Sequence, residues 1–431
     1  MTTVAEPVAP STRPTTAGDQ ALLPLVVGAT VCLLPFLAPP GPGNTALADA
    51  AMAVSILLGV LWCVHTRVVV RLPYSVGVAL MVTGGALAGT LSAASAQTTL
   101  VLLQDLFLLL WAATLALGAQ EPSIVMVATK VWCRLAPLYA AMGVLAYLIG
   151  FAPLSGVNES NGVRASYTFG DPNVAANFLV MSLFMMAACQ RPRARSTRWL
   201  SYVLVLLAMG FTGSNGGMLT LIIGALLSVT LSVHHRRGSF AGTVSLIVTG
   251  ILVAFMAFVV MPRVDLGALR EQAAGSVPLL RDSFGRSDSS VSERTVILEE
   301  GFSVFLSSTG TGVGPAGTKA SLERSQAPYV KEAHNDYLAT LLERGLLGAI
   351  GLMVFGVAVG GRCLRLVSGK LPAAYAAAVP RPWLLVVIAP VMATAGGFYE
   401  VLHFRHLWTW LGILAALALV AERPPRLKGP S

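Results

Sequence analysis

The stretch TTLVLLQDLFLLLWAATLALG, residues 98–118, decides the fold class of this chain. It contains one charged side chain, Asp105, and it matches the roughly 20 residues that an α-helix needs to cross a bilayer. Because the hydrocarbon offers no water to satisfy backbone polar groups, a spanning segment must be a helix or part of a closed barrel. The run lacks the alternation of a barrel strand and therefore predicts a transmembrane helix.

Similar apolar runs recur along the whole chain. The 431 residues are 55% hydrophobic and only 11% charged, and the mean hydropathy is +0.73. On a ~19-residue window we predict about twelve spans, near 21–38, 45–64, 74–95, 98–118, 135–151, 173–189, 199–213, 216–233, 241–261, 345–361, 383–399 and 403–421. The predicted fold class is all-α: a polytopic integral membrane protein with about twelve transmembrane helices and one long external loop containing short helices.

The positions of Lys and Arg predict the orientation of these helices, because cytoplasmic loops retain basic residues. If the N-terminus is inside, the cytoplasmic connections hold Arg67, Arg71, Lys130, Arg134, Arg191, Arg193, Arg195, Arg198, Arg236, Arg237, Arg362, Arg365, Lys370, Arg381, Arg423, Arg426 and Lys428. The short loops on the other side, near 39–44, 96–97 and 214–215, hold none. Both termini are thus predicted to be cytoplasmic. The net charge of +9 is explained by topology, and no nucleic-acid partner is needed.

The same reading divides the chain into segments. We predict a disordered cytoplasmic tail at 1–20, membrane helices over 21–261 with an external loop at 152–172, a long external loop at 262–344, further membrane helices over 345–421, and a cytoplasmic tail at 422–431. Loops much longer than ~15 residues in a compact protein are usually functional or disordered. Within the long loop we predict a helix from Val291 to Leu306 with Ser292 as its N-cap.

The run HNDYLATLLERGLLG, residues 334–348, places polar and titratable side chains where the long loop meets a span. Asn335 and Asp336 are good helix caps, and the glycines that follow suit close helix packing. Glu343 and Arg344 are expected to form a structural ion pair or to anchor the helix at the membrane boundary. His334 is either a capping residue of this kind or a functional group.

Three motifs over roughly residues 150–350 resemble the O-antigen ligase and O-antigen polymerase (Wzy-like) glycosyltransferases of bacterial envelopes. The first is Arg164 followed by Gly170-Asp171-Pro172-Asn173, and the second is Ser292-Glu293-Arg294 followed by Gly310-Thr311-Gly312. The third is His334-Asn335 followed by Glu343-x-Gly345-x-x-Gly348. The resemblance implies a GT-C-like helical fold in the bacterial plasma (inner) membrane, with the active site on the external face.

The resemblance also implies a substrate and roles for residues. The donor would be a polyprenyl-diphosphate-linked glycan, and the acceptor a glycan, lipid or protein hydroxyl; membrane lipid and polysaccharide-export or flippase proteins are the further partners. Arginines suit a diphosphate because guanidinium binds phosphate oxygens bidentately, and histidine can accept a proton near neutral pH. The predicted catalytic residues are Arg164, Arg294 and His334; the predicted substrate-binding residues are Asn173, Asn335 and Arg405; and Glu343, Gly345 and Gly348 form a structural motif. No metal and no cofactor are expected.

Two departures from the family pattern bear on this interpretation. A Ser-Arg-Gly common in the family is Ser214-Asn215-Gly216 here, and the aromatic residue that often follows the loop arginine is aliphatic, Ile297 or Leu298. The first puts a secondary anion contact in doubt and the second the packing of the loop helix. We also expect His403 and His406, with Arg405 and Glu400, to lie in the last external turn and to face the cavity of His334.

Several functions stay open on the sequence. Ligase and polymerase share the motifs, and polymerase is favoured if the organism is a high-GC Gram-positive without a lipopolysaccharide core. A lipid-linked glycan flippase or transporter is the alternative from another class, although the internal repeats and midplane charges typical of transporters are not evident. An enzyme using polyprenyl-monophosphate sugars would need an acidic residue in its first external loop, where Asp49 is the only acid nearby.

Overall fold

The computed structural model describes residues 17–37, 45–91, 96–158, 163–255, 287–328, 330 and 334–421. Its helices are α1 (Ala17–Leu33), α2 (Leu47–Thr66), α3 (Ser75–Leu91), α4 (Ala96–Ala116), η2 (Leu117–Ala119), α5 (Pro122–Leu148), α6 (Ala152–Ser155), η3 (Tyr167–Phe169), α7 (Pro172–Cys189), α8 (Arg195–Thr212), α9 (Asn215–Phe255), α12 (Ser287–Ser307), α13 (Thr318–Arg324), α14 (Asp336–Ser368), α15 (Ala373–Ala378), α16 (Pro382–Leu385), α17 (Ile388–Gly396), η6 (Val401–His403) and α18 (Arg405–Val420). Within these ranges no strand forms, so the all-helical prediction is confirmed.

The helices support a membrane protein. Among the described residues, six helices are long and apolar enough to cross a bilayer: Leu47–Thr66, Ala96–Ala119, Pro122–Leu148, Pro172–Cys189, Asn215–Ile251 and Asp336–Ser368. Shorter apolar helices cover Leu22–Leu33, Ser75–Leu91, Pro382–Gly396 and Arg405–Val420. Each predicted span overlaps a described helix, and α9 covers two of them on either side of a break at Gly238. The described residues therefore confirm that the chain has membrane-spanning helices, but not that it has about twelve of them.

Several predicted boundaries were wrong. Lys130 and Arg134 do not lie in a connection but inside α5, which begins where Glu121 accepts a hydrogen bond from Ser123 N and Pro122 takes the first helical position. α12 starts at Ser287, so Ser292 is not its cap. The predicted start of a span at residue 345 coincides with a break inside α14 at Gly345, and a further helical arm from Asp336 precedes this break. The predicted tails lie outside the described residues, except that α1 already begins at residue 17.

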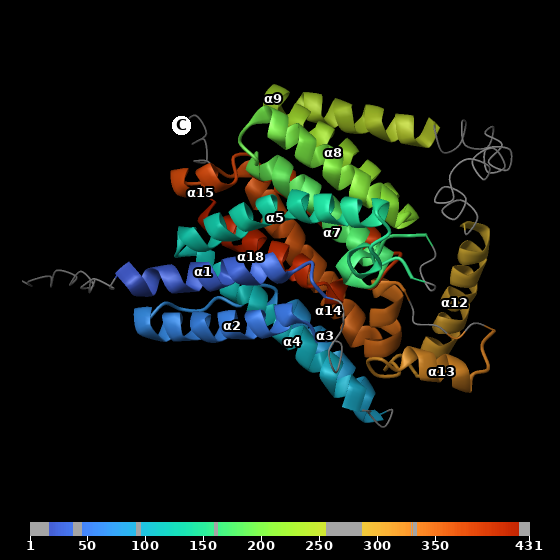
Figure 1. Cartoon of the computed structure of the whole chain (residues 1–431). Coiled ribbons are helices and arrows are strands. Elements are labelled where there is room, and N and C mark those ends of the chain that lie inside the picture. The colour runs from blue at the N-terminus through green and yellow to red at the C-terminus, as the bar shows by residue number, and fades with distance from the viewer. Residues whose placement is uncertain are drawn as a thin grey trace, which may run out of the picture.

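The core is built around α7 and α18, which lie inside the helix body (Figure 1). The fully buried Trp132 stacks on Phe178 with ring centroids 5.8 Å apart. Its indole N–H donates to Ser182 Oγ at 2.9 Å. Satisfying each buried polar atom in this way matters in a membrane core, where no water can take its place. The packed core thus fixes the positions of the helices at whose ends the candidate site lies.

α3 and α14 pack backbone to backbone through glycines. A Cβ added to Gly84 would meet Arg344 O at 2.6 Å, and one added to Gly351 would meet Met81 N at 2.7 Å. Small residues allow such close approach between membrane helices. This contact places the first turns of α14 firmly against the N-terminal half of the bundle.

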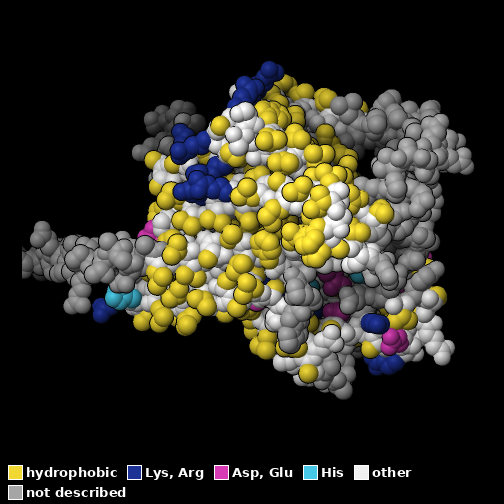
Figure 2. Space-filling model, viewed as in Figure 1, with side chains coloured by type: hydrophobic (Ala, Val, Ile, Leu, Met, Phe, Trp, Pro, Cys, Tyr) yellow, Lys and Arg dark blue, Asp and Glu magenta, His cyan; other side chains and the backbone are white. Residues whose placement is uncertain are grey.

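The helix body has two chemically different ends. At the end we call the basic end lie the connections 67–74, 190–194 and 369–381. Arg381 N donates to Ala188 O at the end of α7, and Arg362 in α14 lies over the Tyr74 ring at 4.4 Å. At the opposite site end, Leu37 N donates to Thr168 O and Ala165 N to Phe211 O. Figure 2 shows hydrophobic side chains over most of one face, Lys and Arg at the upper left and again at the lower right, and acidic side chains in a hollow between the hydrophobic face and the lower right.

Candidate functional site

Two neighbouring cavities open at the site end. The His334 cavity, of about 450 Å³, is lined by Leu37, Ala46, Gln104, Phe169, Gly170, Asp171, Asn173, Val174, His334, Tyr399, Glu400, His403, Phe404 and Arg405. The α4 cavity, of about 1260 Å³, is lined by Thr45, Asp49, Gln97, Leu100, Val101, Leu103, Gln104, Leu106, Phe107, Leu108, Leu110, Ala316, Thr318, Lys319, Glu343, Glu400, His403 and Arg405. The cavities share Gln104, Glu400, His403 and Arg405, and these residues form what we call the shared wall.

His334 is exposed on the wall of the smaller cavity and is held by the cap that follows it. Asn335 is the N-cap of α14: its Oδ1 accepts from the backbone N–H of Tyr337 at 2.9 Å and of Leu338 at 3.1 Å. Its Nδ2 donates to Gly397 O at 3.1 Å. The backbone of His334 itself has φ +44°, which is uncommon for a residue with a side chain. The geometry thus shows Asn335 as a helix cap. This cap sets the direction of the backbone just after His334.

The glycine motifs dock onto each other through the backbone. α14 breaks at Gly345, where φ is 63° and ψ is −165°. Across the break, Leu346 N donates to Gly310 O at 2.9 Å and Val313 N donates to Leu342 O at 2.8 Å. A Cβ on Gly345 would collide with the carbonyl oxygen of Thr311. The turn after α12 therefore needs a glycine opposite it, which explains why these two motifs occur together.

Glu343 and Arg344 anchor different segments and do not form the ion pair with each other that we considered. The Glu343 carboxylate accepts from Ala316 N at 3.0 Å and from Thr318 Oγ1 at 2.7 Å, which ties it to the start of α13. Arg344 pairs with Asp105 on α4, and both side chains are buried. Successive helical residues point in different directions, so neighbours in sequence reach different partners.

Arg164, Asn173 and Ser214 come together behind the smaller cavity. Arg164 donates from Nε to Thr212 O at 2.8 Å and from Nη2 to Asn173 Oδ1 at 2.9 Å. Ser214 Oγ donates to the same Asn173 oxygen at 3.0 Å. Asn173 lines the cavity, so Arg164 stands one side chain behind its wall. The structure thus joins the two ends of the first motif, Arg164 and Asn173, to Ser214 of the Ser214-Asn215-Gly216 segment.

Arg294 lies on α12, and its side chain is outside the described part of the structure. Three residues further along, Ile297 is 4% exposed and packs against Leu338 and Ala339 of α14. The aliphatic residue therefore supplies the helix packing that we had placed in doubt. α12 rests on the turn that immediately follows His334.

The connection from α17 to α18 supplies the shared wall. The buried Asp336 carboxylate accepts from Val401 N at 2.9 Å and Leu402 N at 3.3 Å, which fixes this connection against the start of α14. Glu400 and His403 line both cavities, as we expected for His403. The expectation for His406 was wrong, because its ring is fully buried between Phe169 and Phe178 on the core side of α18.

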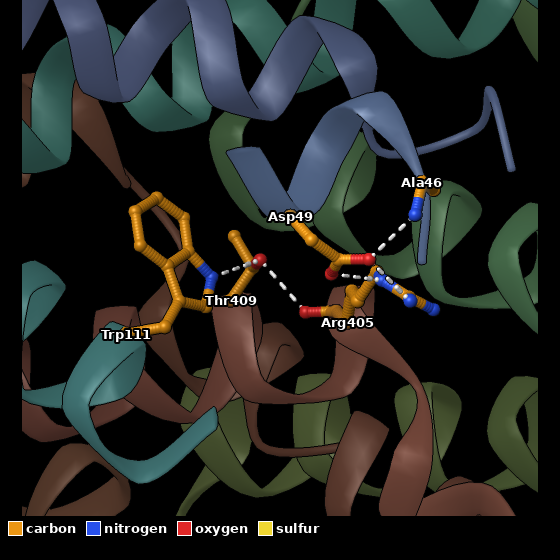
Figure 3. Close-up of polar contacts among 5 residues, drawn as sticks. All are labelled: Ala46, Asp49, Trp111, Arg405 and Thr409. Carbon is orange, nitrogen blue, oxygen red and sulfur yellow. Dashed lines mark hydrogen bonds and ion pairs between the residues drawn. The ribbon is translucent and has the colours of Figure 1, made fainter. Parts of the chain in front are cut away.

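Arg405 is held by a carboxylate far away in the sequence (Figure 3). Its Nε donates to Asp49 Oδ1 and its Nη2 to Asp49 Oδ2, both at 2.6 Å. Asp49 Oδ2 also accepts from Ala46 N at 2.7 Å at the start of α2. Such a bidentate pair fixes the plane of the guanidinium. Sequence reasoning did not connect the two, since 356 positions separate them.

Sequence reasoning also missed other residues of the cavity walls, namely Gln104 and Tyr399. Asp171, which belongs to the first motif, is the N-cap of α7 and also lines the smaller cavity. In the described ranges, no group of three or more His, Cys, Asp or Glu side chains is placed to hold a metal ion. The walls offer carboxylates, imidazoles and a guanidinium, which are groups that hydrogen-bond hydroxyls and phosphates.

The comparisons with known proteins agree with these motifs. A family model described as O-antigen ligase matches residues 200–353, from α8 through the break in α14. This range contains Ser214, Arg294, His334 and the glycines of the docked turn. Arg164, Asn173, Asp49 and Arg405 lie outside it. A search among curated proteins finds no match.

Proposed function

Residues 200–353 match the O-antigen ligase family, and from that match we propose that this chain is a cell-envelope glycosyltransferase. It would move glycan from a polyprenyl-diphosphate-linked donor to an acceptor hydroxyl on the external face of the bacterial plasma membrane. Polymerisation of glycan is the form of transfer that we favour. One observation carries the proposal: a cavity lined by His334, Asp171 and Glu400 and a larger, partly apolar cavity meet at one wall.

The α4 cavity suits the lipid-linked donor. One side is an apolar face of α4, formed by Leu100, Leu103, Leu106 and Leu110, and all four side chains are also exposed on the outside of the body. A prenyl chain can lie against such a face without losing contact with the membrane. The polar groups of this cavity, Lys319 and Arg405 among them, gather where a diphosphate would follow the chain.

The His334 cavity suits the acceptor sugar. Its volume of about 450 Å³ lies within the usual range for small-molecule sites. Asp171, Tyr399 and Glu400 line it together with His334, and these groups hydrogen-bond sugar hydroxyls.

The reaction follows from this arrangement. The acceptor oxygen attacks the anomeric carbon of the donor as the bond from that carbon to the diphosphate oxygen breaks. His334 takes the proton of the acceptor hydroxyl, and the polyprenyl diphosphate leaves with its negative charge stabilised by arginine. Arg164 and Arg294 are the arginines that we propose for this role, Arg164 acting from behind Asn173. Neither step requires a metal.

The topology of the proposal rests on charge. The basic end, with Arg381 and the other retained cations, would face the cytoplasm, and the site end would face outward. Counting α8, the two arms of α9 and the shorter apolar helices together with the other long helices gives about twelve crossings, an even number that would leave both termini on the cytoplasmic side.

The test is transfer by purified protein in nanodiscs, supplied with lipid-diphosphate-linked glycan and EDTA and analysed by gel and mass spectrometry. The control for His334→Ala is the substitution His65→Ala, since His65 is an exposed histidine near the basic end. The control for Arg164→Ala and Arg294→Ala is Arg71→Ala. Loss of a general base typically lowers the rate about 100-fold or more. Longer lipid-linked glycan indicates a polymerase, and label on a different acceptor indicates a ligase. Full activity of His334→Ala would refute the base, and a folded wild type that transfers nothing would refute the enzyme.

A further inference from the structure

We propose that Arg405 recognises the donor diphosphate at the shared wall, and that Asp49 is the positioning residue that aims it. The inference rests on the proposed function and deepens it, since it adds to the anion site an arginine that lies outside the residues matched by the family. Arg405 would bind phosphate oxygens directly, and Asp49 would act only through Arg405.

The position of Arg405 is the first argument. It lines both cavities, so a group passing between a lipid-linked donor in one and an acceptor in the other meets its guanidinium. The diphosphate is the charged group at that junction. Arg164, by contrast, does not line either cavity and donates to Asn173.

The way Arg405 is held is the second argument. Its side chain is 9% exposed and that of Asp49 is 18% exposed, so the pair is largely withdrawn from solvent. Asp49 binds the Nε edge of the guanidinium, while a guanidinium carries five N–H donors in a fixed plane. Fixing one edge fixes the direction of the rest. Arginine so pre-organised loses little entropy when it binds an oxyanion.

The backbone of Arg405 is fixed as well. Thr409 Oγ1 donates to Arg405 O at 2.9 Å, and Trp111 Nε1 donates to Thr409 Oγ1 at 2.9 Å (Figure 3). Trp111 is on α4, whose outer turns form the apolar side of the larger cavity. One connected set of bonds therefore sets Arg405 relative to the surface proposed for the prenyl chain.

A purely structural pair, joining α2 to α18, would use the same contacts, so the experiment must separate the two roles. We would measure the transfer kinetics of Asp49→Asn, Asp49→Glu, Arg405→Lys and Arg405→Ala with donor and acceptor varied separately, and the amount of folded protein by size exclusion. Asp49→Asn is expected to raise the donor KM about tenfold, the effect of losing roughly one charged hydrogen bond. The acceptor KM should stay near the wild-type value, and Asp49→Glu should recover part of the donor affinity.

Chemical rescue supplies the sharper readout. Added guanidinium ion should restore transfer to Arg405→Ala, because the carboxylate of Asp49 holds the ion where the side chain was. It should not restore transfer to the Asp49→Ala, Arg405→Ala double variant. The matched control is Asp105→Asn, which removes another buried arginine's partner and should lower folded yield without a selective change in donor KM.

The outcomes are distinct. Wild-type donor kinetics in Arg405→Ala, or losses that only follow the amount of folded protein and do not respond to guanidinium, overturn the inference while leaving the glycosyltransferase intact. Absence of transfer by the wild type overturns the proposed function and the inference with it.

Discussion

Replacing Gly345 with alanine should uncouple the external turn from α14. The residue has φ 63° and ψ −165°, a conformation that is nearly restricted to glycine and costs other residues about 1–3 kcal/mol. The new Cβ would also collide with Thr311 O, so the turn must move. Moving it breaks the bonds from Leu346 N to Gly310 O and from Val313 N to Leu342 O, each worth about 1 kcal/mol.

The sum is a loss of roughly 3–5 kcal/mol, a large part of the stability of an ordinary domain. Thermal unfolding in detergent, followed by tryptophan fluorescence, should show a midpoint lower by roughly 5 °C. Transfer activity should fall as well, because the turn carries α12 and Arg294. Limited proteolysis between residues 308 and 328 should become faster.

Gly356→Ala is the matched control on the same helix. A Cβ there meets nothing within 4 Å, and alanine is favoured over glycine in a helix by about 1 kcal/mol. This variant should be as stable as the wild type or slightly more stable. If Gly345→Ala unfolds at the same temperature as Gly356→Ala and is cleaved no faster, the reasoning about the docked turn is wrong.

Substitutions at three further residues test contacts of the site by thermal unfolding and proteolysis. Glu343→Ala removes two acceptors of the segment before α13 and should expose that segment to proteases at a stability cost of about 2 kcal/mol; unchanged cleavage would contradict the anchor. Asn335→Ala should lose about 1 kcal/mol of helix capping, most of which Asn335→Asp should retain, and equal losses in both would argue against the cap. Asp105→Asn leaves the Arg344 charge buried without its carboxylate and should cost about 3 kcal/mol, so a wild-type midpoint would count against this pair.

The helices and the family were accessible from the sequence for physical reasons. Hydrocarbon excludes unsatisfied backbone, so every apolar run such as 98–118 had to be a helix, and the structure confirms it over Ala96–Ala116. The resemblance rested on residue types at fixed spacings around His334, and the family match over 200–353 confirms it. At the start of α5, where Lys130 and Arg134 interrupt an apolar helix that begins at Pro122, hydropathy alone misplaced the boundary.

Local spacing could not supply the partners of the charged residues. Arg344 forms its ion pair with Asp105, 239 positions away in the sequence, and not with its neighbour Glu343. His406 and Arg405 are adjacent, yet α18 turns one into the core and the other to the cavities. Both outcomes depend on which helices pack together. The residue pattern of a single helix does not indicate its packing partners.

The sequence by itself determined that the chain is helical, that it suits a membrane, and that it carries an O-antigen ligase signature, because each of these depends on composition or short-range spacing. The tertiary structure alone decided that connections from four parts of the chain close around two cavities, and that Asp49 orients Arg405 between them. The reason is that burying a charge requires a partner of opposite charge in three dimensions, and the chain can bring that partner from any distance.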